Sequence, residues 1–60
     1  MISIIIPVYN EEENIDLLNK KIFSTLKNES FEIIFVNDGS NDNSLSKMKN
    51  LSYKYNNVIL

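Results

Sequence analysis

The sequence contains no cysteine, no histidine and no arginine, and only one glycine and one proline in 60 residues. Without cysteine or histidine, these residues can hold no disulfide, no thiolate zinc site and no Ser-His-Asp triad. A single glycine excludes both the GxGxxG fingerprint of dinucleotide-binding domains and the GxxxxGK[ST] phosphate loop. The remaining composition is that of an ordinary globular protein, with 43% hydrophobic and 23% charged residues.

The charge balance argues against nucleic acid as a partner. The six basic residues are all lysines, and eight acids bring the net charge to −2 at pH 7. Binding of nucleic acid needs a basic face that matches the phosphates, and the missing arginines remove the bidentate phosphate fork. The longest apolar run, Ile4 to Val8, is far below the roughly 20 residues of a membrane span. We therefore expect no nucleic-acid partner, and membrane contact only through parts of the protein outside this chain.

Apolar runs alternate with amphipathic segments along the chain. Ile2 to Val8 and Phe31 to Val36 are near-continuous runs of β-branched and aromatic residues, typical of parallel strands covered on both faces. Apolar residues at helical spacing predict a helix from about Glu11 to Lys27. A second amphipathic segment and a third apolar run, Val58 to Leu60, follow. This alternation predicts an α/β fold with parallel βαβαβ order and right-handed crossovers.

Capping residues and apolar stripes refine the two predicted helices. Asn10, with Glu13 three residues later, matches a capping box for the first helix. Ser40 or Asn41 is expected to cap the second helix. The apolar stripe of the first helix is Ile15, Leu18, Ile22 and Leu26. The inner face of the second is Leu45, Met48, Leu51 and Tyr55.

The chain is short for the fold that its pattern predicts. Domains most often have roughly 100–150 residues, and a third strand begins where this sequence stops. We therefore expect residues 1–60 to be the N-terminal part of a single, longer domain.

Acid-bearing turns follow the first two predicted strands. IIIPVYNEEEN breaks from its apolar run after Val8, and EIIFVNDGSND does so at Asn37. In an open α/β sheet, ligands bind outside the carboxyl ends of the strands, beside the helix N-termini that follow. The pattern therefore predicts a small polar ligand, a nucleotide, at this edge.

Most of these acids also have a purely structural interpretation, because acids in a first helical turn interact favourably with the helix dipole. That interpretation fits Glu12, Glu13, Asp16 and Asp42. Glu11 lies closer to the strand end, where its carboxylate can accept a ribose hydroxyl. Asp38 suits either hydrogen bonds from a nucleotide or an Asx-turn before Gly39. Tyr9 either offers its ring to a base or sugar, or packs half-buried.

Together, IIIPVYNEEENI and EIIFVNDGSNDNS closely resemble the opening of family 2 glycosyltransferases, which have the Rossmann-like GT-A fold. The resemblance covers the whole chain. It implies an enzyme that moves a sugar from a UDP- or GDP-sugar donor to an acceptor. This segment would form the donor-nucleotide half of the site and would not be catalytic alone.

The resemblance also implies roles for individual residues. Pro7, Tyr9 and Glu11 match positions that line the base and ribose pocket. Asp38 matches the second acid of the family's D-D-G-S and would accept the N3–H of a uracil or the equivalent edge of a guanine. Asn37 stands where many members have Asp, so it keeps an acceptor oxygen but lacks the charge.

Within the family, N-D-G-S combined with P-V-Y-N-E-E is most similar to enzymes that charge a polyprenyl phosphate. Dolichol-phosphate mannose synthases and bactoprenol glucosyltransferases are examples. The resemblance implies a glycan or polyprenyl-phosphate acceptor, a cytoplasmic location at the face of the membrane, and a role in cell-envelope or glycan biosynthesis. It also implies Mg²⁺ or Mn²⁺ at the diphosphate, bound by ligands outside these residues.

Two alternatives from other functional classes remain open at this point. A non-catalytic nucleotide-binding module on the same scaffold would keep Asp38 but lack the family's metal motif. A response-regulator-like signalling domain also has acids after its first strand, but it needs a phosphoacceptor Asp after its third.

Overall fold

The computed structural model describes residues 1–60 and has the predicted alternation of strands and helices. Strand β1 comprises Ile2–Val8, helix α1 Ile15–Thr25, strand β2 Phe31–Asn37, helix α2 Ser44–Lys54 and strand β3 Val58–Ile59. Each helix has 11 residues, and neither is long and apolar enough to cross a membrane. The predicted βαβαβ order is confirmed.

The strands form one parallel sheet in the order β1-β2-β3. The pairing of β1 with β2 starts at Ile2 with Phe31 and ends at Val8 with Asn37. Both strands therefore end at the same level, and the loops that follow them leave from adjacent points. This register brings together the two acid-bearing turns.

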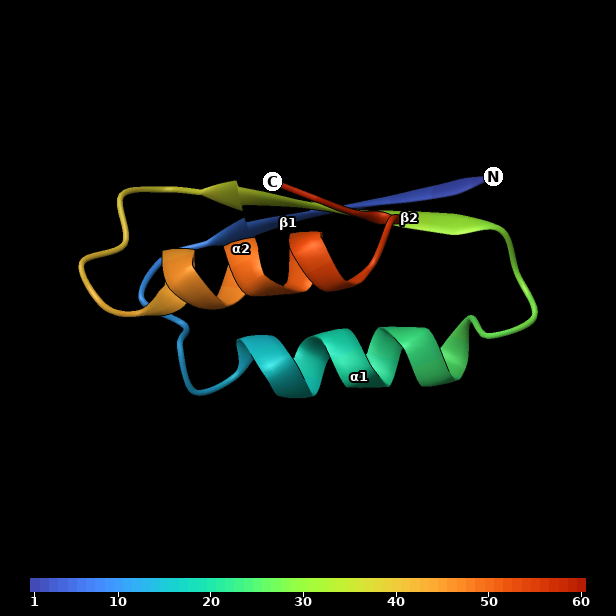
Figure 1. Ribbon diagram of the computed structural model, residues 1–60, viewed down its shortest axis with the longest axis horizontal. Coiled ribbons are helices and arrows are strands. Elements are labelled where there is room, and N and C mark those ends of the chain that lie inside the picture. The colour runs from blue at the N-terminus through green and yellow to red at the C-terminus, as the bar shows by residue number, and fades with distance from the viewer.

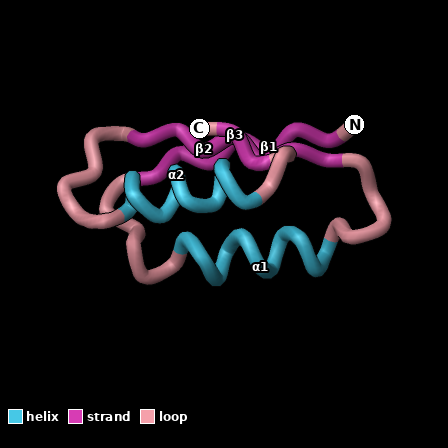
Figure 2. The backbone as a smooth tube through the Cα atoms, viewed as in Figure 1, coloured by secondary structure: helices cyan, strands magenta, loops and turns pink.

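Both helices lie on the same face of the sheet (Figures 1 and 2). Crossovers of one hand between neighbouring parallel strands in this order bring both helices to one face. The prediction that the strands are covered on both faces is therefore wrong for these residues. On the other face, Ile5 is 66% exposed and Val36 47% exposed. A continuous run of β-branched residues predicts a strand that is buried on both faces, but in β2 only alternate residues are buried.

The core lies between the sheet and the helices. It contains eight buried apolar residues, which supply most of the favourable free energy of folding. They are Val8, Ile15, Phe31, Ile33, Phe35, Met48, Leu51 and Val58. Phe23 packs against the edge of this cluster, with its ring 5.2 Å from that of Phe31 in an edge-to-face arrangement. Among the residues of the two predicted apolar stripes, Leu18 is the most exposed, at 37%.

Both predicted helix starts are wrong. Helix α1 begins at Ile15, not near Glu11, and its N-cap is Asn14, whose side chain makes no capping bond. Asn10 cannot cap it, because it has a φ of 50° in the left-handed region and its side chain binds another loop. The capping box with Glu13 therefore does not form.

Helix α2 begins at Ser44 with Asn43 as its N-cap, so neither Ser40 nor Asn41 has the predicted capping role. Ser40 is instead engaged by the loop that follows β1, where its hydroxyl accepts a hydrogen bond from the Asn10 N–H. Contacts between the loops take the place of a local cap at α1, while at α2 the Ser44 N–H binds the nearby Asp42 side chain.

Candidate functional site

The loops after β1 and β2 lie side by side at the carboxyl edge of the sheet. The Asp38 N–H donates to the Val8 carbonyl at 2.8 Å, which continues the strand pairing by one residue. Tyr9 therefore begins the first loop next to the point where Asp38 begins the second. The sequence-based prediction that these two turns share an edge is confirmed in its geometry.

The predicted site residues of the first loop face solvent. Tyr9 is 57% exposed, and Pro7 and Glu11 are exposed as well. Pro7 is the next-to-last residue of β1, near the strand end where a residue without an N–H was expected. The Glu11 carboxylate accepts one local hydrogen bond, from the Asn14 side-chain amide at 3.0 Å. The ring of Tyr9 and one edge of the Glu11 carboxylate remain available to a ligand.

In the second loop, Asp38 does not make the Asx-turn that was one of its two interpretations. Asn37, not Asp38, makes the local turn contact: its Oδ1 accepts from the Ser40 N–H at 3.1 Å. The Asp38 side chain is exposed and its carboxylate makes no hydrogen bond within the chain. Gly39 has a φ of +79°, a conformation that L side chains rarely adopt. The turn thus presents a free carboxylate from Asp38, while the acceptor oxygen of Asn37 is already used.

Hydrogen bonds join the two loops directly. The Asn10 N–H donates to the Ser40 Oγ at 3.0 Å, and the Asn41 N–H donates to the Asn10 Oδ1 at 2.7 Å. The Ser40 hydroxyl in turn lies 3.4 Å from the Val8 carbonyl, to which it donates. The left-handed backbone of Asn10 is thus held from both sides by the second loop.

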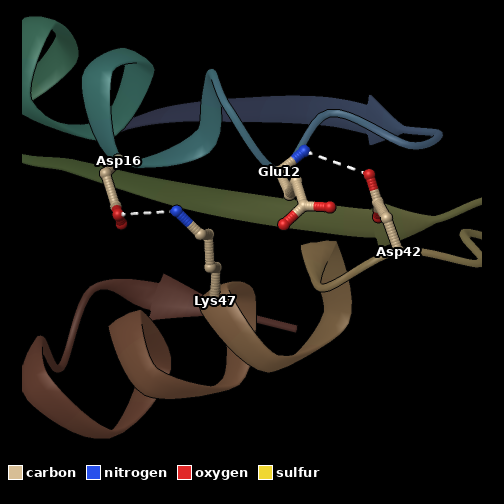
Figure 3. Close-up of polar contacts among 4 residues, drawn as sticks. All are labelled: Glu12, Asp16, Asp42 and Lys47. Atoms are coloured by element: carbon tan, nitrogen blue, oxygen red, sulfur yellow. Dashed lines mark hydrogen bonds and ion pairs between the residues drawn. The ribbon is translucent and has the colours of Figure 1, made fainter.

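A second set of contacts continues this connection toward helix α2. The Glu11 N–H donates to the Ser44 Oγ at 2.9 Å, and the Glu12 N–H to the Asp42 Oδ2 at 3.3 Å (Figure 3). The other oxygen of Asp42 accepts from the Ser44 N–H at 2.9 Å. We call the hydrogen bonds of Ser40, Asn41, Asp42 and Ser44 with residues 10–12 the loop clamp.

The loop clamp also changes the electrostatics of Asp42. Its contact with the Ser44 side chain lowers the pKa of Asp42 below the ordinary value of 3.8. Partial desolvation opposes this, while the backbone N–H groups of Ser44 and Glu12 lower the pKa further. Asp42 is therefore an ionised acceptor at neutral pH. The sequence-based interpretation as a helix-dipole acid missed this role.

Asp16 fits the helix-dipole interpretation better. It lies in the first turn of α1 and pairs with Lys47 of α2 at 3.3 Å (Figure 3). Both side chains are substantially exposed, so this ion pair contributes little to stability. It connects the two helices and involves no residue of the two loops.

The predicted site residues at the carboxyl edge lie on an exposed surface and line no cavity. One cavity of about 520 Å³ lies between the helices, and a second of about 350 Å³ lies beside β1 and α1. Neither is lined by Tyr9, Glu11 or Asp38. The acids do not gather into a group of three that would hold a metal ion. This edge offers acceptors and an aromatic ring to a ligand, and it does not fit a metal.

Comparison with known proteins identifies the family. The model of the glycosyl transferase family 2 matches residues 3–60, which is nearly the whole chain. The chain belongs to glycosyltransferase family 2. The resemblance seen in the sequence is thereby confirmed, and the membership favours an enzyme over the response-regulator alternative.

Curated family 2 relatives include several proteins named for polyprenyl carriers. The chain is 43% identical over 54 residues to a dolichol-phosphate mannosyltransferase of Pyrococcus furiosus, covering 90% of this chain and 15% of that protein. It is 49% identical over 43 residues to a prophage bactoprenol glucosyl transferase homolog of Escherichia coli, covering 68% and 14%.

Another family 2 relative is named for a different acceptor. The chain is 43% identical over 60 residues to a poly(ribitol-phosphate) beta-glucosyltransferase of Bacillus spizizenii, covering 98% of this chain and 10% of that protein. Across these three relatives, the chain spans about a sixth of their length or less.

Proposed function

We propose that this chain forms the donor-nucleotide half of the active site of a glycosyltransferase. The enzyme would transfer a sugar from a UDP- or GDP-sugar to an acceptor. The observation that carries the proposal is that the free carboxylate of Asp38 and the exposed ring of Tyr9 each follow one of two paired parallel strands, at their shared carboxyl edge.

Each residue has a distinct part in this proposal. Asp38 accepts a hydrogen bond from the base, the N3–H of a uracil or the corresponding edge of a guanine. Tyr9 contacts the base or sugar with its ring, and Glu11 accepts a ribose hydroxyl. Pro7, next to last in β1, lies at the base of this loop and lines the base and ribose pocket. Asn37 contributes through the turn, because its oxygen already binds the Ser40 N–H.

The acceptor we propose is a polyprenyl phosphate. Its support is the set of relatives whose names include dolichol phosphate and bactoprenol, together with the N-D-G-S and P-V-Y-N-E-E sequences. A polyprenyl carrier would bring the enzyme to the cytoplasmic face of the membrane. A Mg²⁺ or Mn²⁺ ion at the diphosphate would neutralise the leaving group, and the residues of this chain would not bind it.

Calorimetric titration of the intact protein with UDP, GDP and their sugars tests the half-site. The wild type is expected to bind one of the two diphosphates. Asp38→Ala is expected to bind it about tenfold more weakly, because a hydrogen bond from the base to a charged acceptor is lost. Glu13→Ala is the matched control, since Glu13 is an exposed acid of the first loop that makes no side-chain hydrogen bond.

The outcomes separate the parts of the proposal. A wild type that binds neither diphosphate overturns the nucleotide site. Equal affinity of Asp38→Ala and wild type overturns the role of Asp38 alone. A protein that binds nucleotide but transfers no radiolabelled sugar to a polyprenyl phosphate would instead be a non-catalytic binding module, or would use another acceptor.

A further inference from the structure

The first loop of the proposed nucleotide site has no support from a local helix cap. The α1 N-cap, Asn14, makes no side-chain capping bond, and the turn that carries Glu11 and Glu12 precedes the helix. Backbone N–H groups just before and within the first helical turn have no partner inside the helix. Their acceptors here come from residues about thirty positions away, Ser44 for Glu11 and Asp42 for Glu12.

Asp42 differs from the other clamp residues because its two oxygens have different partners. Oδ1 binds the Ser44 N–H within its own loop, and Oδ2 binds the Glu12 N–H of the other loop (Figure 3). One oxygen thus shapes the turn into α2 and the other fixes where the first loop lies relative to it. The Asp38 carboxylate and the Glu11 carboxylate are on the two loops that this side chain connects.

We propose that Asp42 is a positioning residue that holds the first loop in place for a nucleoside diphosphate before the ligand arrives. The inference rests on the proposed nucleotide function and adds to it a residue that does not touch the ligand. Without this contact, the loop carrying Tyr9 and Glu11 would lose one of the hydrogen bonds that hold it before nucleotide binds. Nucleotide binding would then have to supply part of the ordering, which would weaken affinity.

Substitution by asparagine separates the two oxygens of Asp42. Asp42→Asn keeps one acceptor oxygen and replaces the other by an NH₂ group, so it can accept from only one of the two N–H groups. The contact with Ser44 is the shorter, at 2.9 Å against 3.3 Å, so we expect the amide oxygen to keep it and only the contact between loops to be lost. Asp42→Ala loses both contacts. If Asp42 merely shaped its own turn, Asp42→Asn would behave like wild type; if it positions the first loop, Asp42→Asn will behave like Asp42→Ala.

The affinity of the intact protein for UDP and GDP, measured by calorimetry, provides the readout. Both Asp42 variants are expected to bind the preferred diphosphate about tenfold more weakly, the effect of losing one hydrogen bond to a charged group. Asp16→Asn is the matched control, since it removes an acid that also bridges two elements but pairs with Lys47 of α2 and with no residue of the two loops. It is expected to leave affinity unchanged.

Amide hydrogen exchange of ligand-free wild type gives an independent test that needs no variant to fold. The Glu12 amide donates to Asp42 and is expected to exchange more slowly than the neighbouring Glu13 amide, which has no acceptor. Equal exchange at the two amides would overturn the inference. So would a wild type that binds nucleotide no more tightly than Asp42→Asn. A wild type that binds no nucleotide at all would overturn the proposed function, and this inference with it.

Discussion

Two polar side chains are buried in this chain, one in each of two contrasting regions. Ser44 lies at the carboxyl edge with no exposed surface, and its Oγ accepts from the Glu11 N–H. Asn19 lies in helix α1 and is 4% exposed, and its Oδ1 has no hydrogen-bond partner. A buried polar atom is favourable when it is paired and costly when it is not.

The contrast shows how the chain divides its interactions. The helix layer is held by apolar packing, and its one buried amide is a local cost. The carboxyl edge is held by polar contacts between segments far apart in sequence, which fix a first loop that no helix cap supports. Helix α2 takes part in both, because it buries Ser44 and, one turn later on the same face, Met48.

The largest expected effect on stability is that of Met48→Ala. Met48 has no exposed surface, so its removal leaves a cavity and should lower the free energy of unfolding by about 2–5 kcal/mol. Urea unfolding followed by circular dichroism measures this loss, with Met48→Leu as a volume-matched control. Nucleotide affinity of the folded protein should not change. A large fall in affinity would contradict the separation of the two regions.

Ser44→Ala should have a smaller effect on stability and a clear effect on binding. It leaves the partly buried Glu11 N–H without its acceptor and should reduce the free energy of unfolding by about 1–3 kcal/mol. Affinity for UDP or GDP should fall as well, because the loop clamp loses one contact. Ser46→Ala, at an exposed position of the same helix, is the control for helix propensity. If Ser44→Ala lowers stability but leaves affinity unchanged, the Ser44 contact does not support nucleotide binding.

The smallest expected effect has the opposite sign. Asn19→Leu replaces an unpaired buried amide by an apolar side chain of similar size and should raise the free energy of unfolding by about 1 kcal/mol. Asn19→Asp should lower it, since it buries a charge without a partner. If Asn19→Leu destabilises the protein, the Asn19 amide makes a stabilising hydrogen bond, and the contrast with Ser44 disappears.

Much of the fold follows from patterns within short stretches of sequence. The apolar runs around Ile5 and Ile34 predict parallel strands, and the spacing of Met48 and Leu51 predicts the buried face of α2. The pairing of the acid-bearing turns also follows, because neighbouring parallel strands end at one edge.

The rest depends on contacts that no local pattern encodes. Asn10 matches an N-cap, but Ser40 and Asn41 bind its backbone and side chain and hold it in the left-handed region. Asp42, two residues before Ser44, matches an Asx-turn, yet nothing nearby in sequence identifies Glu12 as its second partner. Only the register of β1 against β2 brings these residues together.

Hydrogen exchange of the intact protein with and without UDP or GDP tests the central claim most directly. The account predicts that the bound diphosphate slows exchange in residues 9–12 and 37–41, the two loops of the carboxyl edge. It predicts no change in residues 28–30, the turn at the opposite edge of the same sheet. Saturating nucleotide that leaves both loops unchanged, or protects only the opposite turn, would contradict the claim.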